Sequence, residues 1–143
     1  LSQLSLSGDS TTLSLSYQDI DGNSNTETIV INQSNEFAIY GPQGVGSTLL
    51  NGPNPFDPAF ESTEIGFQIT QAATIKAEIY SLNLDRVFRA NFDVSAGYNH
   101  ITWTGKDGSG DGVPNGVYIL VLRATNANGA KISKRHKIAV LRR

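Results

Sequence analysis

The sequence predicts an all-β protein built as an antiparallel β-sandwich. Three observations support this fold class. Thr, Ser, Val, Ile and Asn are abundant, and short runs alternate apolar and polar residues, as strands with one buried face do. Gly, Asn, Asp or Pro interrupts these runs about every ten residues, which is the turn spacing of a sandwich. Apolar residues show almost no helical periodicity.

Residues 1–40 are expected to form an additional N-terminal β-hairpin segment. Strands at 12–17 and 26–32 flank the sequence QDIDGNSN, whose Asp-Gly-Asn cluster tolerates the positive φ of a turn. Shorter strands are expected around Leu4 and Leu6 and at 36–40. The segment is too short for a core of its own. We therefore expect it to pack on the second unit, to complete a domain that this chain lacks, or to lend strands to a neighbour.

Residues 41–52 are expected to be a linker, and residues 53–143 a second domain. The stretch 41–58 holds four glycines and four prolines without a regular period, which marks a boundary between units. Alternating runs then predict strands at 64–69, 74–82, 85–94, 98–105, 116–125 and 130–141. The run 116–125 is apolar on both faces, so it should lie centrally in a sheet. This number of strands in about ninety residues fits one immunoglobulin-like, fibronectin III-like sandwich.

Composition excludes several classes of protein. The chain contains no cysteine, which rules out a disulfide scaffold, a thiol nucleophile and a thiolate metal site. Apolar runs are all too short to span a membrane. We find no leader at Leu1, so an export signal would have been removed or would lie outside this sequence.

The net charge of -2 conceals an uneven distribution. Residues 1–75 contain eight acidic residues and no Lys or Arg, whereas residues 76–143 contain all eleven basic residues and five acidic ones. Such a division can steer an acidic partner, or the acidic end of another copy, toward the basic end. Alternatively, the two halves neutralise each other within one monomer.

Several motifs in residues 54–141 resemble a known family. NPFDPAFESTEIGFQI, AEIYSLNLDRVFR, ITWTGKDGSGDGVPNGVYILVLRA and KRHKIAVLRR are similar to segments of C-terminal sorting domains of the type IX secretion kind. They are equally similar to the related immunoglobulin-like domain of the flagellar hook-capping protein. Ser81 and Asp85 stand where that family more often has Asp and Gly. The resemblance implies an exported bacterial protein, and it implies a core position for Trp103.

Two aspartate-rich loops are candidate calcium sites. Asp107, Ser109 and Asp111 fill the first, third and fifth positions of a calcium loop, but Tyr118 occupies the twelfth, which requires a bidentate carboxylate. Asp19, Asp21 and Asn23 form a similar cluster that lacks the ligands at both ends. The alternative, which the missing ligands favour, is a pair of turns in which Asp and Ser bond the local backbone. No other cofactor is indicated.

Signatures of enzymes and of nucleic-acid binding are missing. The sequence contains neither Gly-x-Ser-x-Gly nor His-Glu-x-x-His, and each histidine, His100 and His136, lies in a strand among polar neighbours. The basic tail lacks interleaved aromatic residues. We therefore expect a non-catalytic protein, not an enzyme.

The expected function is a secreted or cell-surface β-sandwich module for attachment, export or assembly of a larger surface protein. Its expected partners are proteins, either other copies of itself or the secretion and cell-surface machinery. One alternative is a self-assembling subunit of an extracellular fibre or surface layer, in which the acidic strands of one copy engage the basic end of the next. A second alternative is a flagellar hook-capping protein, and an enzyme ranks last.

Overall fold

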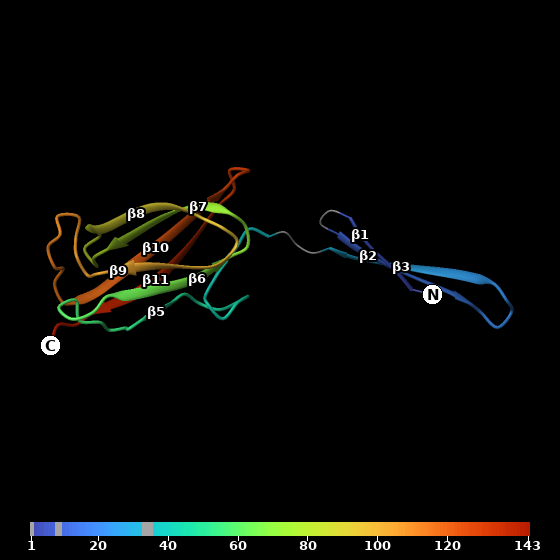
Figure 1. Cartoon of the computed structure of the whole chain (residues 1–143), viewed down its shortest axis with the longest axis horizontal. Helices are drawn as coiled ribbons and strands as arrows, with labels where there is room; N and C mark the ends of the chain where they lie inside the picture. Colours follow the sequence, from blue (N-terminus) through green and yellow to red (C-terminus); the bar gives the residue numbers. More distant parts are fainter. Residues whose placement is uncertain (1, 8–9, 33–35) are drawn as a thin grey trace. The chain divides into compact units, whose positions relative to one another are not determined.

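The computed structural model describes residues 2–7, 10–32 and 36–143, with side chains described for 16–26 and 36–143 (Figure 1). The chain divides into two compact units, Leu1–Glu36 and Phe37–Arg143, which we treat separately. The described residues form antiparallel strands and contain no helix, so the predicted all-β class is confirmed. This part of the chain therefore offers no helix long and apolar enough to cross a membrane.

Unit 1 is a three-stranded antiparallel sheet in the order β1-β2-β3. Its strands are β1 (Ser2–Ser7), β2 (Ser10–Gln18) and β3 (Ser24–Asn32). The predicted turn joins β2 to β3, which pair from Gln18↔Ser24 to Ser10↔Asn32. β1 pairs along Ser2–Ser7 with the other side of β2, so the first strand is a full member of the sheet.

Unit 2 is a sandwich of two antiparallel sheets. One sheet has the order β11-β10-β7-β8, formed by β7 (Ala73–Tyr80), β8 (Arg86–Val94), β10 (Gly116–Asn126) and β11 (Lys131–Val140). In the other sheet, β6 (Thr63–Ile69) pairs with β9 (Gly97–Trp103) and with two short strands, β4 (Ile39–Tyr40) and β5 (Leu50–Gly52). β10 lies between two neighbours, as its two apolar faces predicted.

The core of unit 2 lies between the inward faces of these sheets. Alternate residues of β7 and β10 are fully buried, among them Ile75, Ile79 and Leu122. Trp103 is also buried, with Phe56 and Tyr118 packed edge-on at ring-centroid distances of 5.6 and 5.5 Å. The Tyr118 hydroxyl donates a 2.6 Å hydrogen bond to the Pro114 carbonyl, which satisfies the polar end of this aromatic cluster.

The boundary between the units differs from the expected one. Residues 37–52, which we expected to be the end of the N-terminal segment and a linker, belong to the sandwich. Ile39 and Leu49 are 1% and 3% exposed in its core. β4 is the end of the strand expected at 36–40, whereas β5 was not expected, because its three residues are too few to show alternation in the sequence. The loop between them is tight, since a Cβ on Gly41 would lie 1.8 Å from the Thr48 carbonyl oxygen.

Candidate functional site

Both aspartate-rich loops adopt the same hairpin conformation, and this conformation occurs four times in the described residues. In each, the N–H of the first residue donates to the carbonyl of the fifth, and the N–H of the fourth donates to the carbonyl of the first. The fourth residue has φ between 68° and 88°. This is a type I turn followed by a left-handed residue. The loops are Asp19–Asn23, Ser81–Asp85, Asp107–Asp111 and Asn126–Ala130.

The carboxylate of Asp107, a candidate calcium ligand, accepts hydrogen bonds from the backbone of its own loop. Its Oδ1 accepts the N–H groups of Ser109 at 2.9 Å and Asp111 at 3.0 Å. Asp19 likewise accepts from the N–H groups of Asp21 and Asn23, and these bonds lower the pKa of its carboxyl. Asn126, a neutral residue, makes the same pair of bonds to Asn128 and Ala130.

The loop geometry therefore needs an acceptor at its first position but no negative charge. Tyr118, at the twelfth position counted from Asp107, is buried beside Trp103. No group of three or more His, Cys, Asp or Glu side chains that could hold a metal occurs among the described residues. Calcium at either loop stays a prediction.

The two histidines lie apart in unit 2. His136 Nε2 lies 2.6 Å from Asn51 Oδ1, and burial lowers the pKa of its imidazole. His100 pairs with Gly66 across the other sheet and stacks loosely on Tyr98, with a ring-centroid distance of 6.3 Å.

The NPFDP motif joins the end of β11 to the rest of the sandwich. Asn54 Oδ1 accepts the Ala139 N–H at 2.8 Å, and Phe56 exchanges backbone hydrogen bonds with Ala139 and Leu141. Asp57, which is 3% exposed, accepts the backbone N–H groups of Arg143 and Ala59 at 3.0 Å each. These two bonds, that of Arg143 first, hold the pKa of its carboxyl below the usual value.

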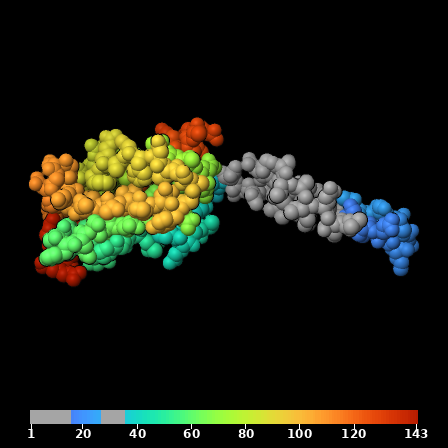
Figure 2. Space-filling model, in the orientation of Figure 1, coloured from blue at the N-terminus to red at the C-terminus, as the bar shows by residue number. Residues whose placement is uncertain are grey.

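The WTGKDGSGDGVPNG motif closes the same end of unit 2. Arg142 donates to the Val113 carbonyl and, through its backbone N–H, to Asn115 Oδ1 at 2.8 Å. Figure 2 shows this loop, in orange, beside the C-terminal residues in red. These two of the four motifs that carry the family resemblance therefore have structural roles.

The outward face of the sheet β11-β10-β7-β8 carries most of the positive charge. The cross-strand register places seven of the eleven basic residues on it, together with two carboxylates, Glu78 and Asp93. We call this surface the cationic face. Its basic residues are Lys76, Arg86, Arg89, Arg123, Lys131, Arg135 and Lys137.

Glu78 is buried at the centre of the cationic face. It is 2% exposed and forms ion pairs with Lys76 Nζ at 3.4 Å, Arg86 Nη1 at 3.1 Å and Arg123 Nη1 at 2.7 Å. Burial raises the pKa of the carboxyl, but hydrogen bonds from Arg86, Tyr80 and Lys76 outweigh it, so the net pKa is lowered. The carboxylate is thus ionised at neutral pH and holds three cationic side chains from three strands.

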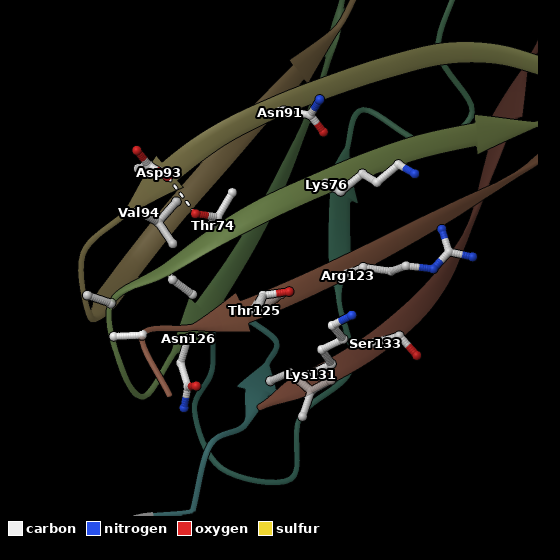
Figure 3. Close-up of a pocket in the computed structure, with 15 residues that line it drawn as sticks. Thr74, Lys76, Asn91, Asp93, Val94, Arg123, Thr125, Asn126, Lys131 and Ser133 are labelled. Atoms are coloured by element: carbon white, nitrogen blue, oxygen red, sulfur yellow. Dashed lines mark hydrogen bonds between the residues drawn. The ribbon is translucent and has the colours of Figure 1, made fainter. Parts of the chain in front are cut away.

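A groove of about 980 Å³ lies at one end of the cationic face (Figure 3). Lys76 and Arg123 are cross-strand partners and extend along the groove in the same direction, while Lys131 enters from β11. Asp93, on the far strand, accepts a 2.7 Å hydrogen bond from Thr74 Oγ1. Much of the groove is lined by apolar side chains, and three of its four charged residues are cations, so its charge favours an anionic group.

Uncompensated charge on the cationic face is concentrated on β11. Lys76, Arg86 and Arg123 share Glu78, whereas within the described residues no ion pair is found for Lys131, Arg135 or Lys137. The sequence showed the basic tail, but it did not show this face. The detectable signal was the spacing of Lys131, Arg135 and Lys137, all at odd positions of one strand.

Comparisons with known proteins identify the fold. No protein-family model matches the sequence, and no curated protein matches it. Dimeric latent PorU from Porphyromonas gingivalis is similar with a TM-score of 0.61 and 16% identity, over 96% of this chain and 13% of PorU. FLGD from P. aeruginosa is similar with a TM-score of 0.51 and 19% identity, over 60% of this chain and 65% of FLGD.

A third structure is PorZ, an essential bacterial surface component of the type-IX secretion system of Porphyromonas gingivalis. It aligns with a TM-score of 0.44 and 18% identity over 98% of this chain and 16% of PorZ, a likeness too weak to carry an argument. The chain thus spans a small part of PorU and less than two thirds of FLGD. At these identities the similarities show a shared β fold alone.

Proposed function

We propose that the chain is a non-catalytic β-sandwich module of an exported bacterial protein, and that it mediates attachment, export or assembly at the cell surface. The observation that carries this proposal is the cationic face. Seven basic side chains and two carboxylates, one of them buried, give this face a net charge of +5 on a protein whose total charge is -2. A field of this kind attracts and orients an anionic partner.

The fold likeness supports the idea of a module within a larger protein. The part of PorU that resembles this chain is 13% of that protein. Two of the motifs that resemble export and hook-capping domains, NPFDP and WTGKDGSGDGVPNG, close one end of the sandwich, while the other two contribute parts of β7, β8 and β11 to the cationic face. We place the module at the cell surface or outside the cell, with a protein as its partner.

The proposal is tested by deleting residues 37–143 from the protein that carries them in its native bacterium. Protease accessibility on intact cells and the amount released into the medium are then measured. We expect the deletion to abolish surface retention. Unchanged retention contradicts the proposal.

A pair of charge-reversed variants separates the cationic face from the rest of unit 2. Arg89→Glu reverses a cation on the face, and Lys106→Glu reverses one outside the sheet. We expect only the first variant to weaken retention.

The division of charge favours a second candidate, a self-assembling subunit. Residues 1–36 contain five carboxylates and no Lys or Arg, while the cationic face belongs to unit 2. Light scattering at low and high salt distinguishes the two candidates. A mass that falls as salt rises supports self-assembly, and a monomer throughout supports the module.

The likeness to FLGD favours a third candidate, a flagellar hook-capping protein. In that case the same deletion would stop motility. Loss of surface retention with normal motility would exclude this role.

A further inference from the structure

One edge of the cationic face is an open strand edge. Ala139 of β11 directs both backbone groups away from β10, because its N–H donates to Asn54 Oδ1 and its carbonyl accepts from the Phe56 N–H. In an antiparallel pair, outward-directed residues alternate with those bonded to the partner strand. The β10–β11 register runs without a shift, so Lys131, Ser133, Arg135 and Lys137 direct their backbone groups outward as well.

The chain itself closes only one end of this edge. Asn54 Nδ2 donates to the Lys137 carbonyl, and Phe56 forms a parallel bridge with Val140. The segment 54–56 thus already pairs with β11 along its C-terminal half. From Lys131 to Arg135, no partner for the outward backbone groups is found within the described residues. This open length accommodates about five residues of an added strand.

The side chains beside the open edge are basic on the outward face and partly apolar on the other. Lys131 and Arg135 lie on the cationic face, where no ion pair neutralises them within the described part of the chain. Ile132, on the opposite face, is half-buried and packs against the core. The exposed Lys134 lies next to Ile132 on that opposite face. An added strand would therefore meet Lys131 and Arg135 with one set of alternate side chains, and Ile132 and the Lys134 stem with the other.

Resting on the proposed function, we propose that the open edge of β11 binds an extended acidic segment of a partner protein by strand addition. The segment has acidic residues at alternate positions and apolar, β-branched residues between them. Backbone hydrogen bonds hold it to the edge, and Lys131 and Arg135 select its charge. The same cations repel the β11 edge of a second copy, which would place Lys131 and Arg135 against like charges.

The proposal is tested by fluorescence anisotropy with the full chain and a labelled, end-blocked peptide, Glu-Val-Glu-Ile-Glu-Val-Glu. Two further peptides of the same sequence carry methyl groups on alternate backbone nitrogens, one on the odd-numbered residues and the other on the even-numbered residues. In one of the two, the methylated nitrogens are those that face β11. Methylation removes the backbone donors and leaves the charge unchanged. We expect one alternation to bind at least about tenfold more weakly than the unmodified peptide. Equal binding of all the peptides overturns strand addition.

Variants of the edge make the same distinction on the protein side. Ser133→Pro removes an outward N–H, and proline is tolerated where that group faces solvent on an edge strand. Ser133→Ala keeps the N–H and is the matched control. We expect about a tenfold loss of peptide affinity with Pro and less than about a twofold change with Ala. If Ser133→Pro fails to fold, the methylated peptides on the wild-type chain still decide the question.

Arg135→Glu should weaken peptide binding about tenfold, and Lys106→Glu, an equal charge change outside the sheet, should not.

Two further outcomes identify a different occupant. Binding of dextran sulfate that displaces the peptide and is insensitive to Ser133→Pro overturns the proposal in favour of an anionic polysaccharide. Self-association that Ser133→Pro abolishes overturns it in favour of a second copy.

The two proposals fail separately. If deletion of residues 37–143 releases the carrier protein but the edge variants bind peptide normally, only strand addition is wrong. If the deletion changes nothing, the proposed function is wrong whatever the peptide does.

Discussion

Glu78 is the residue on which the cationic face depends. It is 2% exposed, and its three cationic partners keep 41–50% of their side-chain exposure. Replacing Glu78 by Gln leaves three cations beside one another without a counter-charge. We expect a loss of about 2 kcal/mol in unfolding free energy, less than for a fully buried pair because water reaches the partners. Urea denaturation at pH 7 measures it, with Asp93→Asn on the same face as a control expected to cost less.

The pH dependence of stability follows from the lowered pKa of Glu78. The unfolded carboxyl takes up its proton near pH 4.3, whereas the folded carboxyl takes it up at lower pH. The stabilisation is therefore complete above about pH 4.3 and is lost as the pH falls through the folded pKa. The Glu78→Gln variant should lack this pH-dependent part of the unfolding free energy. Identical acid-unfolding curves for the variant and the wild type would contradict it.

Leu84 is strained where its counterparts are glycine. It has φ of 68° and is 80% exposed, while Gly22, Gly110 and Gly129 fill the same position in the other three loops. A left-handed backbone conformation destabilises a non-glycine residue by roughly 1–2 kcal/mol, and glycine removes this strain. Part of the gain is offset because glycine also raises the conformational entropy of the unfolded chain. We expect Leu84→Gly to raise the unfolding free energy by about 0.5–1 kcal/mol in thermal denaturation. Leu82→Gly, in the same loop without positive φ, should lower it.

Asp107 distinguishes a turn from a calcium site. If its role is to accept two backbone N–H groups, Asn should replace it within about 0.5 kcal/mol, as Asn126 does in its own loop, and Ala should cost about 1 kcal/mol. We expect thermal melts of the wild type to be the same with calcium and with chelator. A melting temperature that rises with calcium in the wild type, but not in Asp107→Asn, would establish the metal site instead.

Some residue roles could be read from the sequence and others could not. The turn signals of both aspartate loops are local, lying within five residues, and they appear in the structure as hairpin loops. Glu78 could not be assigned, because its partner Arg123 is 45 positions away and meets it through the β7–β10 register. The sequence suggested residue 85 as the place of the family's glycine, whereas the left-handed residue is Leu84.

At the level of elements, the 103–118 motif is held in place by close contacts around Gly105. This residue has φ of +70°, and a Cβ would lie 2.5 Å from Pro58 Cγ and 3.2 Å from Phe56 Cζ. Its carbonyl also accepts the Val113 N–H at 2.9 Å. The NPFDP motif therefore packs directly on the WTG motif, although the two are far apart in the sequence.

Gly105→Ala should be strongly destabilising for both of these reasons. We expect a loss of about 3 kcal/mol, from the left-handed backbone and the overlap with Pro58. Gly108→Ala is the matched control, because nothing lies within 4 Å of its Cβ position and its φ is not in the left-handed region. Equal melting temperatures for the two variants would show that the 103–118 motif is not held by this contact.

At the scale of the whole chain, the sequence predicted the sandwich but not its boundary. Long strands with clear alternation, such as β7 and β10, were expected within about two residues of their observed ends. β5 was missed because three residues carry no period and its glycine looked like one of a linker, whereas β4 was expected, but only as the end of a strand at 36–40 outside the sandwich. The cationic face was missed for a related reason, since its charges come from four strands whose register the sequence does not state.

The two boundaries make different predictions for fragments of the chain. Residues 37–143 keep Ile39 and Leu49 in the core and Asn51 beside His136, whereas residues 53–143 lose all three. Each deleted core side chain costs about 2–5 kcal/mol, and the fully buried Thr63 also loses its partner Asn51. We expect the longer fragment to unfold cooperatively in urea and the shorter one to be unfolded or to lose most of its stability. Equal urea midpoints for the two fragments would mean that the sandwich is complete without β4 and β5. Residues 41–52 would then be a linker, as their glycines and prolines suggested.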